Sequence, residues 1–159
     1  MAYADLLRGL AGTWRLTREV STPDGACGAA LTARMEGQAS FSLEAGFSSE
    51  AEIYRYIEEG ELVMAGGSGA AIAFSRGYIY GALEHGLDIY FDDDQRRLFQ
   101  HVTLLRKNNT LEGEATHLCV PDTYRSRYRF DMPDAFEIFH AVEGPRKRYV
   151  IHSRYDRAV

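Results

Sequence analysis

The stretch THLCVPDTYRSRYRF, residues 116–130, carries the pattern that decides the fold. After the Val-Pro-Asp turn at 120–122, tyrosine, serine, tyrosine and phenylalanine alternate with arginine. Side chains that alternate with period two lie on opposite faces of a β-strand. An alternating segment also precedes the proline turn, so the stretch predicts an antiparallel hairpin.

The same pattern continues along the chain in both directions. Turn signals rich in Gly, Pro, Asn and Asp recur between alternating segments, including Glu-Glu-Gly at 58–60. They predict ten or eleven strands joined by short links, which is an antiparallel meander. A two-sheet sandwich is the second choice, because it would need a long crossover connection.

A meander with this many strands curls, and closure removes its exposed edges. The sequence therefore predicts an all-β protein, a single antiparallel up-and-down β-barrel of about ten strands. The barrel takes up residues 1–159 as one domain. Helical periodicity is confined to the start of the chain, where Leu6, Leu7 and Leu10 share one side of a short N-terminal helix.

Composition limits the classes of function. The chain has 159 residues and a formal net charge of −5, which argues against nucleic-acid binding through excess Lys and Arg. No apolar run reaches the length of a membrane span, and no signal peptide is visible. We expect Cys27 and Cys119 to be free thiols in a cytoplasmic protein.

Alternation also predicts which side chains line the barrel interior. His117 and Cys119 share a face with the apolar residues of their strand, whereas Arg125, Arg127 and Arg129 face solvent. The predicted inner wall is both polar and aromatic. We take the following residues as candidate ligand-binding groups: His117, Cys119, Asp122, Tyr124, Tyr128, Arg76, Tyr78, Lys147, Tyr149 and Tyr155.

Three kinds of chemistry are open to the cluster around the Val-Pro-Asp turn. As metal ligands, His117, Cys119 and Asp122 lack the remaining members of any known spacing motif, so no metal site is predicted. A nucleophilic Cys119 would need an activating base in reach, and a small buried thiol is the simpler interpretation. His117 and Asp122 are better suited to acid–base work, since a nearby carboxylate orients the ring and raises its pKa. The same contact would also satisfy a buried polar group.

Two cations and a second histidine are also predicted to face inward. Arg76 lies among aromatic residues and needs an anionic partner, supplied either by an internal salt bridge or by a ligand. Lys147 follows the Gly-Pro turn and would either pair with Asp122 or anchor a ligand carboxylate. His140 shares a face with apolar residues, and a lone inward histidine is a weak basis for haem binding.

Strand order predicts which turns lie together. Alternate turns of an up-and-down barrel lie at opposite ends, so the Val-Pro-Asp, Glu-Gly-Pro and Asp-Asp-Asp-Gln turns share one end. A count of eleven strands also places Leu10 and Trp14 at that end. The cluster would then adjoin the N-terminal segment that plugs the barrel.

The opening LAGTW, residues 10–14, resembles the start of the calycin superfamily, which includes lipocalins, fatty-acid-binding proteins and nitrobindin-like barrels. In that group an arginine near the chain end often packs across the tryptophan, a role that Arg154 or Arg157 would fill. The segments YRYIEEG, SRGYIYG, IYFDDD, HLCVPDTYRSRYRF and EGPRKRYVIHSRY together resemble an uncharacterised bacterial family with a lipocalin-like barrel. This resemblance covers most of the chain and implies a fold, but no activity. Lipocalins are usually secreted with disulfides, and this chain departs from them in both respects.

We interpret the sequence as a barrel that binds a small amphipathic or anionic molecule, with aromatic walls for apolar contact. No cofactor, nucleic acid or membrane is expected as a partner, and a homodimer is left open. A second interpretation is a small enzyme of isomerase, cyclase or hydratase type. It would use His117 and Asp122 as acid and base, with Tyr124 or Lys147 as electrophile. The pattern is also compatible with a haem-binding barrel or with a structural or interaction module.

Overall fold

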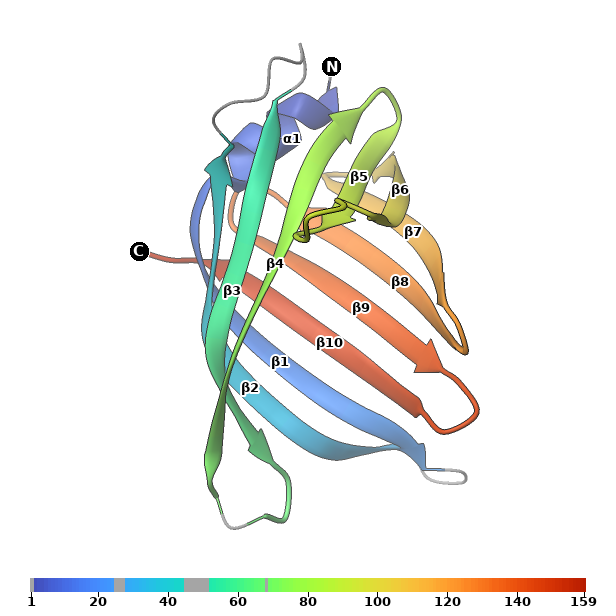
Figure 1. Cartoon of the computed structure of the whole chain (residues 1–159). Coiled ribbons are helices and arrows are strands. Elements are labelled where there is room, and N and C mark those ends of the chain that lie inside the picture. Colours follow the sequence, from blue (N-terminus) through green and yellow to red (C-terminus); the bar gives the residue numbers. More distant parts are fainter. Residues whose placement is uncertain (1, 25–27, 45–51, 68) are drawn as a thin grey trace.

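Figure 1 shows a computed structural model, which describes residues 2–24, 28–44, 52–67 and 69–159 as a curled sheet with one helix at its end. Consecutive strands pair in antiparallel fashion, and β1 also pairs with β10 to close the barrel. The predicted up-and-down barrel with a short N-terminal helix is therefore confirmed. The elements are α1 (Ala2–Leu10), β1 (Gly12–Asp24), β2 (Gly28–Leu43), β3 (Ile53–Met64), β4 (Ala71–Leu83), β5 (Gly86–Phe91), β6 (Leu98–Lys107), β7 (Thr110–Cys119), β8 (Asp122–Asp131), β9 (Ala135–Glu143) and β10 (Arg148–Arg157).

The count of eleven strands was one too many, because the Glu-Glu-Gly segment at 58–60 is not a turn. It lies inside β3, where Glu58 is buried and Gly60 faces Gly37 of β2. A Cβ on Gly60 would lie 2.3 Å from the carbonyl oxygen of Glu36, so a glycine is needed for β2 and β3 to approach this closely. This glycine marks a close backbone approach within a long strand.

The miscount placed the N-terminus at the wrong end of the barrel. Helix α1 lies beside the Met-Pro-Asp turn at 132–134, and a Cβ on Gly9 would be 3.0 Å from Cε of Met132. The Val-Pro-Asp turn lies at the opposite end, because β8 runs the length of the barrel between the two turns. We call these the helix end and the open end. The predicted contact between the Val-Pro-Asp cluster and the N-terminal plug is thus wrong.

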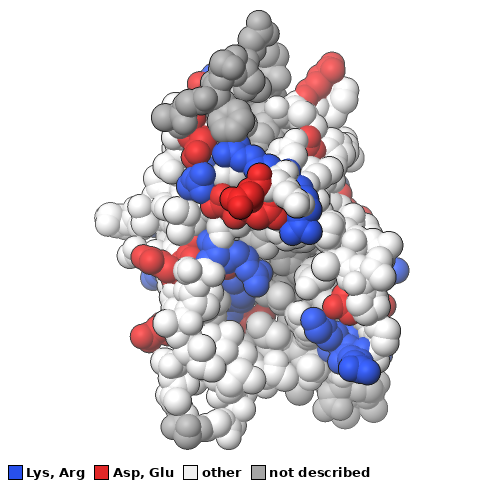
Figure 2. All heavy atoms as spheres, viewed as in Figure 1, with Lys and Arg blue, Asp and Glu red and all other residues white. Residues whose placement is uncertain are grey.

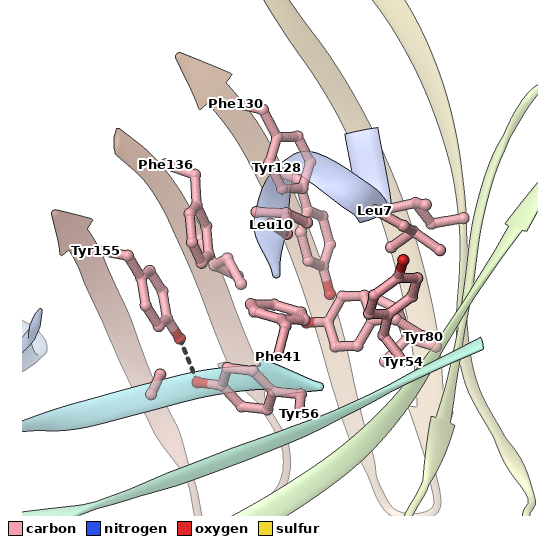
Figure 3. Close-up of a cluster of buried hydrophobic side chains, with 14 of the residues drawn as sticks. Leu7, Leu10, Phe41, Tyr54, Tyr56, Tyr80, Tyr128, Phe130, Phe136 and Tyr155 are labelled. Carbon is pink, nitrogen blue, oxygen red and sulfur yellow. Dashed lines mark hydrogen bonds between the residues drawn. The ribbon is translucent and has the colours of Figure 1, made fainter. Parts of the chain in front are cut away.

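The helix end is sealed by apolar side chains. Leu7 and Leu10 of α1 are fully buried, as the spacing of the leucines predicts. Figure 3 shows them next to a group of inward-facing rings from several strands. The group includes Phe41, Tyr80, Phe130 and Phe136. Because these contacts remove apolar surface from water, the helix acts as a lid on this end of the core.

Trp14 and Arg157 complete this seal. The indole Nε1 of Trp14 donates a hydrogen bond of 2.8 Å to the carbonyl of Leu10. The Arg157 guanidinium carbon lies 3.8 Å from the centroid of the indole ring. Arg157 also donates hydrogen bonds to the carbonyls of Ala11 and Gly9, at 3.0 and 2.5 Å. Of the two arginines named by the resemblance, Arg157 thus packs across the tryptophan.

Replacing Arg157 with alanine removes the guanidinium–indole contact and the hydrogen bonds to the α1 segment. We expect the free energy of unfolding to fall by about 1–3 kcal/mol, measured by urea denaturation with circular dichroism. Arg154→Ala is the matched control, since Arg154 is exposed and pairs with Asp156 on the surface. Its loss should change stability by less than about 1 kcal/mol. Equal losses in the two variants would contradict this account of the seal.

The hydrogen-bonded wall is complete only towards the helix end. Strand β5 pairs with β4 over Tyr78–Leu83, so residues 71–77 of β4 pair only with β3. Strand β6 pairs with β7 only up to Glu114, so residues 115–119 of β7 pair only with β8. We call the interval between these two unpaired edges the side slot. In Figure 1 it lies below the short β5–β6 hairpin.

No helix among the described residues combines the length and the apolar character needed to cross a membrane.

Candidate ligand site

A buried ion pair crosses the barrel interior. Arg18 of β1 donates hydrogen bonds of 2.7 and 2.8 Å to the two carboxylate oxygens of Glu58 on β3. It donates a third, of 2.6 Å, to Oγ of Ser153 on β10. The hydroxyl of Tyr56 donates to Glu58. It also lies 2.8 Å from the hydroxyl of Tyr155, the contact drawn as a dashed line in Figure 3. These contacts tie β1, β3 and β10 together across the interior.

The Arg18–Glu58 pair carries no net charge. Burial raises the pKa of Glu58, but the hydrogen bonds and positive charge of Arg18 outweigh burial, and the pKa lies below its ordinary value. Glu58 is therefore ionised at neutral pH, and Arg18 stays protonated. The Glu58 side chain is 2% exposed and the Arg18 side chain is 14% exposed, so solvent screens the pair little.

A second polar network joins β6, β8 and β9. Tyr128 donates its hydroxyl proton to Oε1 of Gln100, and Nε2 of Gln100 donates to Oγ of Ser126 at 2.6 Å. The Ser126 hydroxyl is then free to donate to Nδ1 of His140, 2.5 Å away. This direction of the chain assigns the His140 proton to Nε2. Burial, together with the charges of Arg18 and Arg76, lowers the pKa of His140 to about 4.

His140 should therefore stay neutral down to about pH 4. Because its pKa is lower in the folded than in the unfolded chain, the unfolding free energy should fall by on the order of 2 kcal/mol between about pH 6.5 and pH 4. A pH titration of the histidine ring resonances by NMR, assigned with His140→Gln, measures this pKa directly. The variant should also lose this part of the pH dependence. A His140 midpoint near 6.5 would contradict the burial and the network described.

A small cavity of about 30 Å³ lies between the two networks, lined by residues from both, including Tyr56, Tyr155 and His140, together with Arg76 and Tyr78 of β4. It has room for about two water molecules. Most of the predicted lumen is filled by side chains. A larger hollow, about 390 Å³, lies outside the barrel over β2 and β3 and contains neither network.

Arg76 is the cation in this site that lacks a counter-ion. It faces inward from β4, directly across from Glu58 in the β3–β4 register. Both Glu58 oxygens are engaged by Arg18, and among the described residues Arg76 has no carboxylate within 4 Å. Figure 2 shows basic side chains gathered in a hollow on this face of the molecule. The predicted inward direction of Arg76 is therefore correct, without the internal salt bridge.

A cluster of aromatic rings lies next to the cavity, on the side of the side slot. The β5–β6 register shifts by one residue opposite Tyr90, and Phe99 and Gln100 both turn inward at this bulge. The Phe99 ring stacks on Tyr78 at 5.3 Å between centroids and meets the edge of His117 at 5.1 Å. We call Tyr78, Phe91, Phe99, His117 and Tyr124 the aromatic mouth.

The structure places the ten predicted site residues in four locations. Tyr128 and Tyr155 are fully buried in the polar networks. Arg76 and Tyr78 line the cavity, while His117, Tyr124 and Tyr149 lie in or beside the aromatic mouth. Burial and the neighbouring Tyr149 hydroxyl raise the pKa of Tyr124 to about 12. The last three, Cys119, Asp122 and Lys147, lie at the rim of the open end.

Three expectations about the Val-Pro-Asp cluster are wrong. The predicted His117–Asp122 pair does not form, because Asp122 binds Nζ of Lys147 at 3.3 Å and His117 lies opposite Tyr124. Lys147 is half exposed at the rim and does not face inward, although its predicted pairing with Asp122 does form. Cys119 is an exposed free thiol at the strand end, where alternation no longer implies burial. Cys27 lies outside the described residues.

The interior is unsuited to two of the cofactors considered from sequence. His140 faces inward as predicted, but its Nδ1 is hydrogen-bonded to Ser126. A 30 Å³ cavity is also an order of magnitude smaller than a site for a molecule the size of haem. Within the described part of the chain, no group of three or more His, Cys, Asp or Glu side chains is placed to hold a metal ion.

Sequence reasoning missed the central ion pair, although its signal was present. Arg18 has the same parity as Trp14 and Leu16, two apolar residues of the same strand that are fully buried. Glu58 has the same parity as Tyr56 but was assigned to a turn. Applied without a break to β1 and β3, alternation would have placed one cation and one anion inside the barrel.

Comparison with known proteins places the chain in a family. A model of a family of unknown function, DUF6314, matches residues 10–157. The chain is a DUF6314 protein. Membership of an uncharacterised family, which the sequence resemblance implied, is thereby confirmed.

A solved structure has the same fold as this DUF6314 chain. It is the S-type phycobiliprotein lyase CPES from Guillardia theta, with a TM-score of 0.66 and 14% sequence identity. The match covers 100% of this chain and 94% of the lyase chain. At this identity the likeness establishes the fold alone. No curated protein sequence matches the DUF6314 chain.

Proposed function

We propose that this protein binds a small amphipathic or anionic molecule through the side slot, with its polar end in the cavity and its apolar body in the aromatic mouth. The observation that carries the proposal is the unpaired Arg76 guanidinium at the junction of the two. Arg76 lines the cavity and is exposed, so an anionic group of a ligand can reach its guanidinium and form charge-assisted hydrogen bonds there. The half-buried rings beside it offer apolar contact.

The size of the cavity supports this orientation. Space for about two water molecules admits a head group, whereas the rest of a ligand must remain among the rings at the slot. The polar groups of the interior lie deeper than the aromatic mouth, so the polar end would enter first. The likeness to the lyase, at 14% identity, concerns the fold and gives no information about the ligand of this protein.

Binding is favoured over an enzymatic function because the acid–base pair that such a function would use is not formed. Asp122 is held by Lys147 at the rim, and His117 packs against Phe99. Among the described residues, His117 has ring contacts but no side-chain hydrogen bond that would fix its tautomer for proton transfer. The same ring contacts are suited to the apolar part of a ligand.

The aromatic mouth can be tested with N-phenyl-1-naphthylamine, a neutral fluorescent probe. His117→Ala should weaken its binding about three- to tenfold, because one wall of the mouth is lost. Leu118→Ala is the matched control: this neighbour is on the outer face and 64% exposed, so its removal should leave the probe affinity unchanged. Fluorescence titration of the wild type and the two variants measures the three dissociation constants.

Failure of the probe to bind the wild type, or equal weakening by both variants, would contradict binding at the mouth. A complementary observation is native mass spectrometry of protein isolated gently from its own host. A bound mass, released by His117→Ala and retained by Leu118→Ala, would support the same site.

A further inference from the structure

We infer that the site accepts one negative charge, as the monocarboxylate of a planar aromatic molecule bound to Arg76, and that Glu58 is the residue that excludes a second negative charge. The inference rests on the proposed function and deepens it from an amphipathic or anionic molecule to a monoanion. In this scheme Glu58 determines the ligand charge that the site accepts, although Glu58 does not itself bind the ligand.

The charged groups that line the cavity leave one positive charge without compensation. They are Arg18, Glu58 and Arg76, while His140 is neutral above about pH 4. Arg18 and Glu58 cancel each other through two direct hydrogen bonds. Arg76 remains, so a ligand with one negative charge restores neutrality.

Glu58 lies where a second ligand anion would have to bind. It is the direct cross-strand neighbour of Arg76, and both of its oxygens are held by Arg18. A second carboxylate directed at Arg18 would therefore meet the negative charge of Glu58 at short range and low exposure. Glu58 thus takes the position on Arg18 that a second ligand carboxylate would need, and so limits the site to one anionic group.

The shape of the site favours a carboxylate on a flat body. The two oxygens of a carboxylate take up about the space of the two water molecules that the cavity can hold, and they match the fork of an arginine. Tyr78 and Phe99, which stack at an interplanar angle of 23°, lie next to Arg76 along the route to the slot. Because these two rings stack on each other, a flat ligand ring would contact their edges or their outer faces.

Three naphthalene compounds of similar size separate charge from ring contact: the neutral 2-carboxamide, the 2-carboxylate and the 2,3-dicarboxylate. Isothermal titration calorimetry at pH 7.5 gives the dissociation constant of each. For the wild type we expect the monocarboxylate to bind about tenfold more tightly than the carboxamide. The dicarboxylate should bind no better than the monocarboxylate.

Two variants test the two residues separately. Arg76→Gln should bind all three compounds with similar affinity, because the anion partner is removed while the aromatic mouth remains. Glu58→Gln frees Arg18 while preserving the size of the side chain, and should make the dicarboxylate the tightest of the three ligands. Arg125→Gln is the control, since this arginine faces outward and is exposed; it should keep the wild-type order.

The outcomes distinguish the two levels of the account. If the wild type binds none of the three compounds, the proposed function and the inference both fail. If it binds all three without preference for the monocarboxylate, or if Arg76→Gln keeps that preference, the inference is wrong and the ligand site itself stands. A Glu58→Gln variant that is folded by circular dichroism and still disfavours the dicarboxylate would remove the role assigned to Glu58.

Discussion

The buried Arg18–Glu58 pair is the interaction on which the interior of this barrel depends. It links β1, β3 and β10 across the lumen and separates the apolar seal at the helix end from the aromatic mouth. Such a pair adds little net stability over apolar residues, but removing one partner leaves a buried charge that costs about 3–5 kcal/mol. Because the pair is electrically neutral, Arg76 stays as a single uncompensated charge. The net positive charge of the candidate site thus depends on the Arg18–Glu58 ion pair, which leaves Arg76 as the remaining charge.

The two ends of the barrel differ in how they are covered. At the helix end, α1, Trp14 and Arg157 cover the core and engage its backbone carbonyls. Towards the open end, the short β5–β6 hairpin leaves parts of β4 and β7 paired on one side only. The hydrogen-bonded wall is therefore incomplete at the side slot, where four of the five rings of the aromatic mouth are partly exposed and Phe99 is buried. A closed, packed end and an accessible aromatic mouth are what a site for a small molecule requires.

Much of this architecture could be predicted from alternation, which correctly gave the barrel, the N-terminal helix and the inward direction of Arg76, Tyr128 and Tyr155. Alternation fixes the face of a residue but does not fix which side chain it contacts. The predicted His117–Asp122 pair is therefore wrong: the β7–β8 register sets His117 opposite Tyr124, and Asp122 binds Lys147. Glycine is the other source of error, because Gly60 lies where two strands approach closely and its sequence context is also typical of a turn. That mistake hid Glu58 and moved the N-terminus to the wrong end. The inward turn of Phe99 depends on a β-bulge, which no pattern in the sequence marks.

The central claim is that Arg76 is the anion partner of a ligand while Arg18 is already satisfied by Glu58. A crystal structure of the wild-type protein with naphthalene-2-carboxylate tests it most directly. The account predicts the carboxylate on the Arg76 guanidinium, the ring among Tyr78, Phe99 and His117, and the two Arg18–Glu58 hydrogen bonds intact. A carboxylate bound to Arg18 in place of Glu58, or a ligand seated outside the barrel with Arg76 unoccupied, would contradict it.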